Sequence, residues 1–212
     1  MSSTPQIPAL GMRAGHFWYS MIAIFLMTVC PYTLAQNGHA HTSAAPQSEL
    51  SSSQRSRQSA LLKIVRDSTE RFKDVAEAER EKYSLIFGCV SGPDEGAMGL
   101  HYLNGDLLDE ANQTGVLDPT RPQIVLYEPT SNGGLRLTGA DFVVFADAWN
   151  TKHPQDPPQL MGQLFHLFDS PNRFGLPAFY TLHVWAWKDN PAGAFVNWHP
   201  NVSCQSFAGQ SQ

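Results

Sequence analysis

The sequence lacks the short motifs by which the common enzyme classes are recognised. Its 212 residues contain no Gly-x-Ser-x-Gly elbow, no glycine-rich phosphate loop, no dinucleotide-binding fingerprint, no His-Glu-x-x-His and no Cys-x-x-Cys. An excess of basic residues is also missing, since 14 Lys and Arg stand against 19 Asp and Glu, a formal net charge of −5. Nucleic-acid binding favours a basic face, so this balance argues against a nucleic-acid partner.

A hydrophobic run long enough for a stable membrane span is missing too. Residues 17–30 form a mostly apolar run of fourteen, preceded by Arg13 and followed by the small residue Ala35. A spanning helix needs about 20 apolar residues, whereas this layout is typical of a secretion signal. A lipoprotein signal ending at Cys30 is disfavoured by the large residue before it. We predict a signal peptide over residues 1–35 and an exported protein, periplasmic or extracellular, with no stable membrane span after cleavage.

Cysteine is scarce, with three residues in the chain. Removal of the signal takes away Cys30 and leaves Cys89 and Cys204, and thiols in an oxidising compartment tend to pair. We therefore predict one disulfide between Cys89 and Cys204. Two free thiols, or two thiolate metal ligands, remain the alternative.

Composition divides the rest of the chain into three parts. Residues 36–57 are rich in Ser, Ala, Gln and His without an apolar period, which is typical of a disordered tether. Residues 58–207, about 150 in number, suit a single globular domain with one core. Residues 208–212 are predicted to be a disordered tail.

The pattern of apolar residues predicts an α+β domain. Residues 59–83 lack Gly and Pro and place apolar side chains at helical spacing, which predicts one long N-terminal helix. Short apolar or alternating runs follow, separated by Gly, Pro, Asn and Asp, at residues 83–90, 99–104, 123–128, 135–145, 163–168 and 179–187. We expect the helix to pack on a mainly antiparallel sheet of five to six strands.

Three histidines interrupt runs that otherwise have the composition of core strands. They are His101, His166 and His183. Alternation along the last run places His183, Trp185 and Trp187 on one face of the strand, with apolar residues between them on the other. This face is the candidate wall of a His- and Trp-lined pocket.

Glu128 is a second unusual residue, because it ends an apolar run directly before a proline. Two imidazoles and one carboxylate suit zinc, iron or copper and leave coordination positions open. The candidate metal ligands are His101, Glu128 and His183, with His166 as a possible fourth. A hydrogen-bonded pocket without metal, or histidines unrelated to one another, are the competing interpretations.

Trp185, Tyr102 and Arg173 are the candidate ligand contacts. Aromatic side chains such as Trp185 stack on flat ligands, although they equally fill cores. Arg173 is a candidate anion contact, and pairing with an acid inside the domain explains it equally well.

The chain resembles a family of exported bacterial proteins. The resemblance covers residues 61–204 and is carried by GAMGLHYxN at 96–104, LDPxRP at 117–122, YEP at 127–129 and a block from HVWAW through NPxG to VSC at 183–204. It implies export and the extent of the domain, and it implies no activity. His101, Glu128 and His183 lie inside the matching blocks.

These observations predict an exported domain whose pocket binds a small ligand or a transition-metal ion. Zinc, iron and copper are the candidate cofactors. A metal-dependent enzyme, hydrolytic or oxidative, is the first alternative, because the same residues leave open coordination positions. A purely structural envelope protein is the second.

Overall fold

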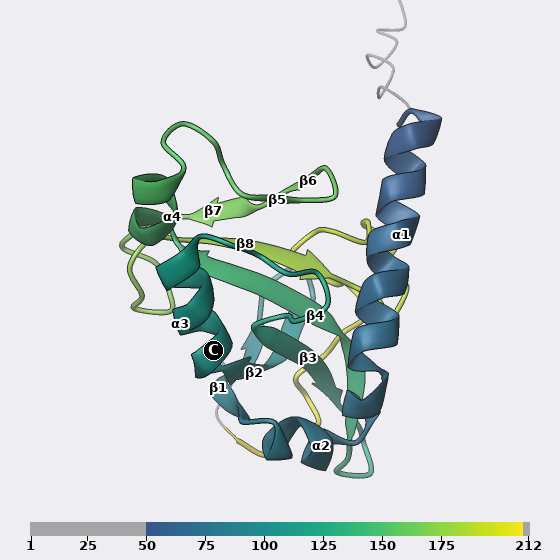
Figure 1. The fold of residues 1–212 in the computed structure, drawn as a ribbon. Helices are drawn as coiled ribbons and strands as arrows, with labels where there is room; N and C mark the ends of the chain where they lie inside the picture. The colour runs from purple at the N-terminus through teal and green to yellow at the C-terminus, as the bar shows by residue number, and fades with distance from the viewer. Residues whose placement is uncertain (1–49, 210–212) are drawn as a thin grey trace, which may run out of the picture. The chain divides into compact units, whose positions relative to one another are not determined.

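The structure, a computed structural model, describes residues 50–209. The predicted signal peptide and most of the predicted tether lie outside these residues. An antiparallel sheet accompanied by helices makes up the described part, so the predicted α+β class is confirmed (Figure 1). None of the helices within residues 50–209 is long and apolar enough to cross a membrane.

The main sheet has six strands in the order β1-β2-β3-β4-β8-β7, each antiparallel to its neighbours. Its strands are β1 (Tyr83–Ser91), β2 (Ala97–Asn104), β3 (Ile124–Pro129), β4 (Leu135–Phe145), β8 (Phe179–Val184) and the short edge strand β7 (His166–Phe168). A separate hairpin joins β5 (Gln159–Leu160) and β6 (Gln163–Leu164). The run predicted as one strand at residues 163–168 is therefore divided between two sheets.

The prediction of one long helix over residues 59–83 is wrong. Three shorter segments take its place: α1 (Ser52–Thr69), the 3-10 helix η1 (Glu70–Lys73) and α2 (Val75–Arg80). The break lies at Asp74, whose backbone is extended (φ −91°, ψ 111°) and whose carboxylate caps α2. α1 also begins early, because Ser51 and Gln54 form a capping box. Residues 52–57, expected in the tether, belong to this helix.

α1 packs its apolar stripe on one face of the sheet (Figure 1). Leu61 and Val65, one turn apart, are fully buried against Ala140 and Phe142 of β4 and Leu182 of β8. Burial of each large side chain contributes roughly 1.5–3 kcal/mol. Because side chains alternate along a strand, the residues between these positions in β4 and β8 face the other side of the sheet.

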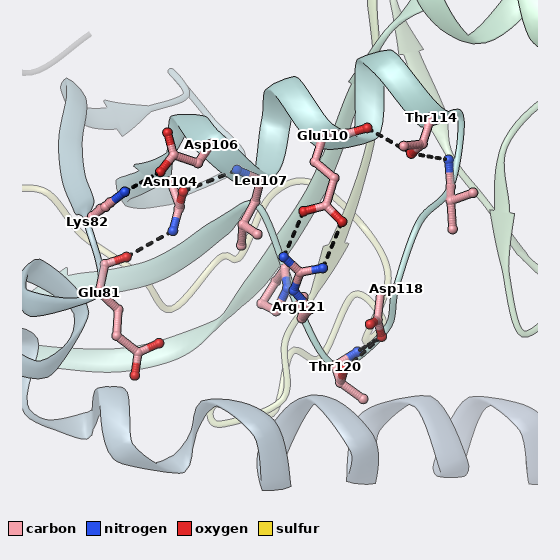
Figure 2. A network of polar contacts seen from close by, with 12 residues as sticks. Glu81, Lys82, Asn104, Asp106, Leu107, Glu110, Thr114, Asp118, Thr120 and Arg121 are labelled. Carbon is pink, nitrogen blue, oxygen red and sulfur yellow. Dashed lines mark hydrogen bonds and ion pairs between the residues drawn. The ribbon is translucent and has the colours of Figure 1, made fainter.

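α3 (Gly105–Thr114) follows β2 directly and is fixed at its N-terminus by one side chain (Figure 2). Asn104 Oδ1 accepts the Leu107 N–H at 3.2 Å, and its amide donates to the Glu81 carbonyl at 2.9 Å. The cap thereby ties the helix to the end of the segment that leads into β1. It also places Leu108 near the sheet face that α1 leaves uncovered.

The C-terminal end of α3 is fixed by a glycine and an ion pair. Gly115 adopts φ 67°, the left-handed conformation that ends a helix and that L side chains rarely take. Glu110 then receives two hydrogen bonds from Arg121, at 2.9 and 2.7 Å (Figure 2). α4 (Ala146–Lys152) follows β4, and His153 Nε2 just beyond it lies 2.9 Å from the Gly115 carbonyl oxygen.

The predicted disulfide between Cys89 and Cys204 is confirmed. The two cysteines are bonded, with their Cα atoms 5.7 Å apart across 115 residues of sequence. The bond ties β1 to the C-terminal segment, and Cys89 is fully buried. Free thiols and thiolate metal ligands are therefore excluded as the state of these residues in the structure.

Candidate metal centre and cavity

Three strands of the main sheet, of which β4 and β8 are adjacent and β2 is separated from β4 by β3, bring two histidines and one aspartate together on the sheet face opposite α1. β2 supplies His101, β4 supplies Asp141 and β8 supplies His183, with Asp141 directly opposite His183 in the antiparallel register. Each offers one ligand atom, and these atoms lie within 4.8 Å of one another. Among the described residues this is the group of His, Cys, Asp and Glu side chains with the spacing of a metal site.

The three side chains are buried, with exposed fractions of 5% for His101, 3% for Asp141 and 2% for His183. His101 Nδ1 lies 3.3 Å from the Gly99 carbonyl oxygen, an arrangement in which Nδ1 donates and Nε2 is free to act as a ligand. Thr181 Oγ1 donates to Asp141 Oδ1 at 2.5 Å and so orients the carboxylate. Hydrogen bonds of this kind hold metal ligands in place in known sites.

His183 is the unusual member of the group. Its Nδ1 lies 3.6 Å from Asp141 Oδ1, too far for a hydrogen bond. Neither ring nitrogen makes a hydrogen bond of good geometry within residues 50–209, although both are buried and the Asn197 side chain lies close enough to His183 to raise its pKa. Most buried polar groups in proteins are hydrogen-bonded, and leaving one unpaired costs about 1–3 kcal/mol. The imidazole therefore faces the cluster with unused ligand capacity.

Burial sets the ionisation of the three groups. It lowers the pKa of His101 to about 4, with a further effect from His183. It lowers the pKa of His183 to about 3, with a further lowering by His166 and an opposing effect of the Asn197 side chain. Burial also raises the pKa of Asp141 to about 6, against opposing effects of His101 and Thr181. At neutral pH both imidazoles are thus neutral and the carboxylate is ionised, which are the forms that bind metal.

The spacing suits a transition metal after a small adjustment. Bonds of 2.0–2.2 Å from zinc to nitrogen and oxygen place the ligand atoms of a tetrahedral site roughly 3.4 Å apart. The present separations of up to 4.8 Å require shifts of the order of an ångström.

The structure places the predicted metal ligands in two separate groups. His101 and His183 come together as expected, but the carboxylate beside them is Asp141. Glu128 forms ion pairs with Lys188 at 2.5 Å and Arg136 at 2.9 Å. His166 lies opposite Thr181 at the sheet edge, is exposed, and is not a member of the group.

Asp141 was missed, although its sequence context carries the same signal as the histidines. It stands between Ala140 and Phe142 in a run that is otherwise apolar and small. An ionisable residue inside such a run is costly unless it is paired or coordinated. Asp141 lies beside His183 because the two residues are paired in the strand register, and that register cannot be obtained from the sequence pattern.

The predicted ligand contacts lie elsewhere in the fold. Trp185 is buried, its Nε1 donates to the Val196 carbonyl at 2.6 Å, and its ring lies 6.1 Å from that of His183. Tyr102 packs edge-on against Tyr127 on the α1 side of the sheet. Arg173 is exposed in the loop between β7 and β8. All three stand outside the lining of the cavity that the described residues form beside the cluster.

Trp187 is on the opposite side from His183, contrary to the predicted alternation. Strand β8 ends at Val184, and the Ala186 N–H turns back to the Val184 carbonyl at 2.8 Å. This turn shifts Trp187 toward α1, where its Nε1 donates to Thr69 Oγ1 at 2.9 Å. The predicted pocket wall of His183, Trp185 and Trp187 therefore does not include Trp187.

An apolar cavity of about 250 Å³ lies beside the cluster. Twelve of its sixteen lining residues are apolar, and the other four are His101, Asp141, Thr181 and His183. Five phenylalanines from separate segments form much of the wall: Phe87, Phe145, Phe168, Phe174 and Phe179. The polar cluster thus forms one region of an otherwise apolar space.

Comparison with models of known protein families, with curated proteins and with solved structures finds no match for this chain. No activity can therefore be assigned to this fold from a related protein. What the domain does has to be argued from the chemistry of the cluster and of the cavity beside it.

Proposed function

We propose that this domain binds a divalent transition-metal ion through His101, Asp141 and His183. The observation that carries the proposal is the convergence of two buried imidazoles and one buried carboxylate, whose ligand atoms lie within 4.8 Å of one another. A bound cation accepts a lone pair from His183 and compensates the charge of Asp141. The same cation binds the free Nε2 of His101, whose other nitrogen is directed to a backbone carbonyl.

The ligand set favours zinc, iron or copper over harder cations. Two imidazoles and one carboxylate are a nitrogen-rich set, whereas magnesium and calcium prefer oxygen ligands throughout. Three protein ligands leave at least one coordination position open. A hydrogen-bonded pocket without metal is the competing interpretation, in which the Asn197 side chain is the partner of one His183 nitrogen and the other nitrogen stays unpaired.

A metal-dependent enzyme is the second candidate function. The observation in its favour is the cavity, because an open coordination position beside an apolar space suits a substrate as well as a water molecule. Turnover by the metal-loaded protein of a panel of esters, peptides and phenols distinguishes catalysis from simple binding. Loss of turnover on chelation, and its return with added metal, supports the enzyme.

Metal content tests the primary proposal. Protein carrying no His tag should bind about one Zn²⁺, Cu²⁺ or Fe²⁺ per chain in calorimetry, and elemental analysis should find the same ratio after dialysis. His183→Asn and Asp141→Asn should each weaken binding by about 10-fold or more, since each removes a ligand. His166→Asn is the matched control, because His166 is a nearby exposed histidine. Equal binding by all four proteins would place the metal elsewhere.

We also infer that the protein is exported. The Cys89–Cys204 disulfide supports this, because disulfides persist mainly in oxidising compartments. The predicted signal over residues 1–35 and the resemblance to exported bacterial proteins point the same way. Expression in a bacterial host, fractionation and N-terminal sequencing test the inference. A mature chain that begins near Gln36 in the periplasm or medium is expected, and full-length chain in the cytoplasm would contradict it.

A further inference from the structure

The size of the cavity limits its occupant to a small molecule. Sites for drug-sized ligands run from about 300 to 1,000 Å³, while a cavity of roughly 150 Å³ accepts benzene. The present cavity of about 250 Å³ lies between these cases. Its volume suits a single ring that carries a substituent of a few atoms.

The walls favour a flat and uncharged molecule. Phe168 and Phe179 are stacked with ring centroids 5.2 Å apart and planes 2° apart, and Phe87 meets Phe174 at 5.1 Å. Such surfaces pair well with another aromatic ring. The lining formed by the described residues includes neither lysine nor arginine, so a carboxylate or phosphate on the occupant has no cationic side chain to meet.

The β1 wall is built from a strained backbone. Phe87 has φ 62°, a left-handed conformation uncommon for a residue with a side chain, and Gly88 next to it has φ 70°. The register between β1 and β2 shifts at this point, between Ile86 and Cys89. Strain of this kind persists where the surrounding structure requires it and is frequent at binding sites. Here the irregularity brings the Phe87 ring into the cavity wall.

The polar region of the cavity specifies one oxygen on the occupant. With a divalent cation bound, one ionised carboxylate and two neutral imidazoles leave a net charge of about +1 at the centre. An open coordination position on such a centre accepts a hydroxyl oxygen and makes its proton easier to lose. Without the cation, the same region carries the negative charge of Asp141 and would attract an ammonium group.

We infer that the cavity binds a neutral single-ring phenol or aromatic alcohol, whose ring lies among the phenylalanines and whose oxygen reaches the metal. The inference rests on the proposed metal site and adds the class of its second ligand. Four observations support it: the volume of the cavity, its aromatic wall, the scarcity of cationic lining residues and the open coordination position of a three-ligand centre.

Cobalt-substituted protein tests the inference, because the visible absorption of Co²⁺ responds to a change in its ligands. 4-Ethylphenol should alter the Co²⁺ spectrum and should bind the metal-loaded protein at least about 10-fold more tightly than the metal-free protein, a difference of about 1.4 kcal/mol. 4-Ethyltoluene has nearly the same shape without the hydroxyl and should leave the spectrum unchanged. 4-Ethylbenzylamine, an ammonium ion at neutral pH, should bind the metal-loaded protein more weakly than the phenol.

A variant that narrows the cavity separates occupancy from metal binding. Leu108→Trp enlarges a lining side chain contributed by α3 and should abolish the response to 4-ethylphenol while Co²⁺ still binds. Leu167→Trp is the matched control, because Leu167 is 52% exposed and stands outside the lining. Phe87→Gly relieves the backbone strain, removes the ring and should also weaken phenol binding.

The outcomes distinguish this inference from the metal proposal. Binding of Co²⁺ with no spectral response to 4-ethylphenol overturns the inference and leaves the metal site standing. Equal affinity for 4-ethyltoluene and 4-ethylphenol also overturns it, since the hydroxyl then contributes nothing. Failure to bind Co²⁺, together with tight binding of 4-ethylbenzylamine to the metal-free protein, overturns both and assigns the cavity to an amine.

Discussion

At the scale of single residues, the charge of Asp141 favours metal binding but lowers the stability of the metal-free protein. Its folded pKa of about 6 lies above the ordinary aspartate value of 3.8, so the folded state favours the protonated form more than the unfolded chain does. Above pH 6 the buried carboxylate therefore destabilises the metal-free protein, while its charge is what a metal needs. Active and binding sites commonly accept such a loss of stability.

Asp141→Asn is predicted to stabilise the metal-free protein at pH 8. The rise of the Asp141 pKa from 3.8 to about 6 corresponds to a destabilisation of roughly 3 kcal/mol by the ionised form, and Asn keeps an oxygen that can accept the Thr181 hydroxyl. Urea denaturation in the presence of EDTA measures the effect. Asp156→Asn, at an exposed position, is the control and should change stability little. A lower urea midpoint for Asp141→Asn would show that the carboxylate is stabilising as it stands.

The two histidines predict the acid sensitivity of the metal-free protein. Their folded pKa values of about 4 and 3 lie below the ordinary histidine value of 6.5, so the unfolded chain binds more protons and stability is lost as pH falls below 6.5. Asp141 acts in the opposite direction between about pH 6 and 3.8. The two histidines together outweigh Asp141, so acidification causes a net loss of stability.

This loss is measurable as a falling urea midpoint between pH 7 and pH 4.5 in EDTA. His183→Gln should flatten the dependence, because one of the two destabilising protonations is removed. Asp156→Asn serves as the control at an exposed position, because His166 itself affects the pKa values of His183 and Asp141. An unchanged slope for His183→Gln would mean that the His183 ring is accessible to protons in the folded state.

At the scale of secondary structure, Asn104 is the residue that positions α3 against the cavity. It caps the helix through Leu107 and binds the Glu81 carbonyl, and its side chain is almost wholly buried. Asn104→Ala should cost about 2 kcal/mol, roughly 1 for the cap and 1 for the second hydrogen bond. Thermal or urea denaturation measures it. Arg121→Gln is the comparison, since its ion pair with Glu110 is exposed and screened by solvent and should contribute little to stability.

The same scale shows what sequence patterns can and cannot predict. Apolar periodicity located the strands and the helical region, because core packing requires it. It did not show the break at Asp74, since a cap one residue long leaves the apolar spacing nearly intact. It also extended the alternation of β8 beyond the end of the strand at Val184. A backbone turn there places the Trp187 side chain on the opposite side of the sheet from the predicted one.

The candidate site illustrates the same limit. His101 and His183 stand out in the sequence because each interrupts an apolar run. Asp141 carries the same signal, but the choice between it and Glu128 depends on strand register. Register follows from how whole strands pair, and the ion pairs of Glu128 with Lys188 and Arg136 depend on it too. Residue types were thus predictable, whereas their three-dimensional partners were not.

At the scale of the whole molecule, the disulfide joins the first strand of the sheet to the C-terminal segment. It connects β1 with the segment after β8, whose Val202 is buried against Ala97 and Trp185. That segment also bonds β2 through paired contacts between Ala97 and His199. The covalent link therefore fixes the C-terminal segment to the first strand of the sheet, beside its backbone contacts with β2.

Removal of the disulfide is predicted to be the most destabilising change among those considered. In the chain-entropy model, closure of a loop of 115 residues is worth about 4–5 kcal/mol, a large part of the total stability of a domain of this size. Cys89→Ala with Cys204→Ala should therefore lower the urea midpoint far more than Asn104→Ala. Cys30→Ser, within the predicted signal, is the control and should leave the mature protein unchanged. If the double variant were as stable as the parent, packing of the C-terminal segment on β2 alone would be sufficient to hold it, and export would not be needed for folding.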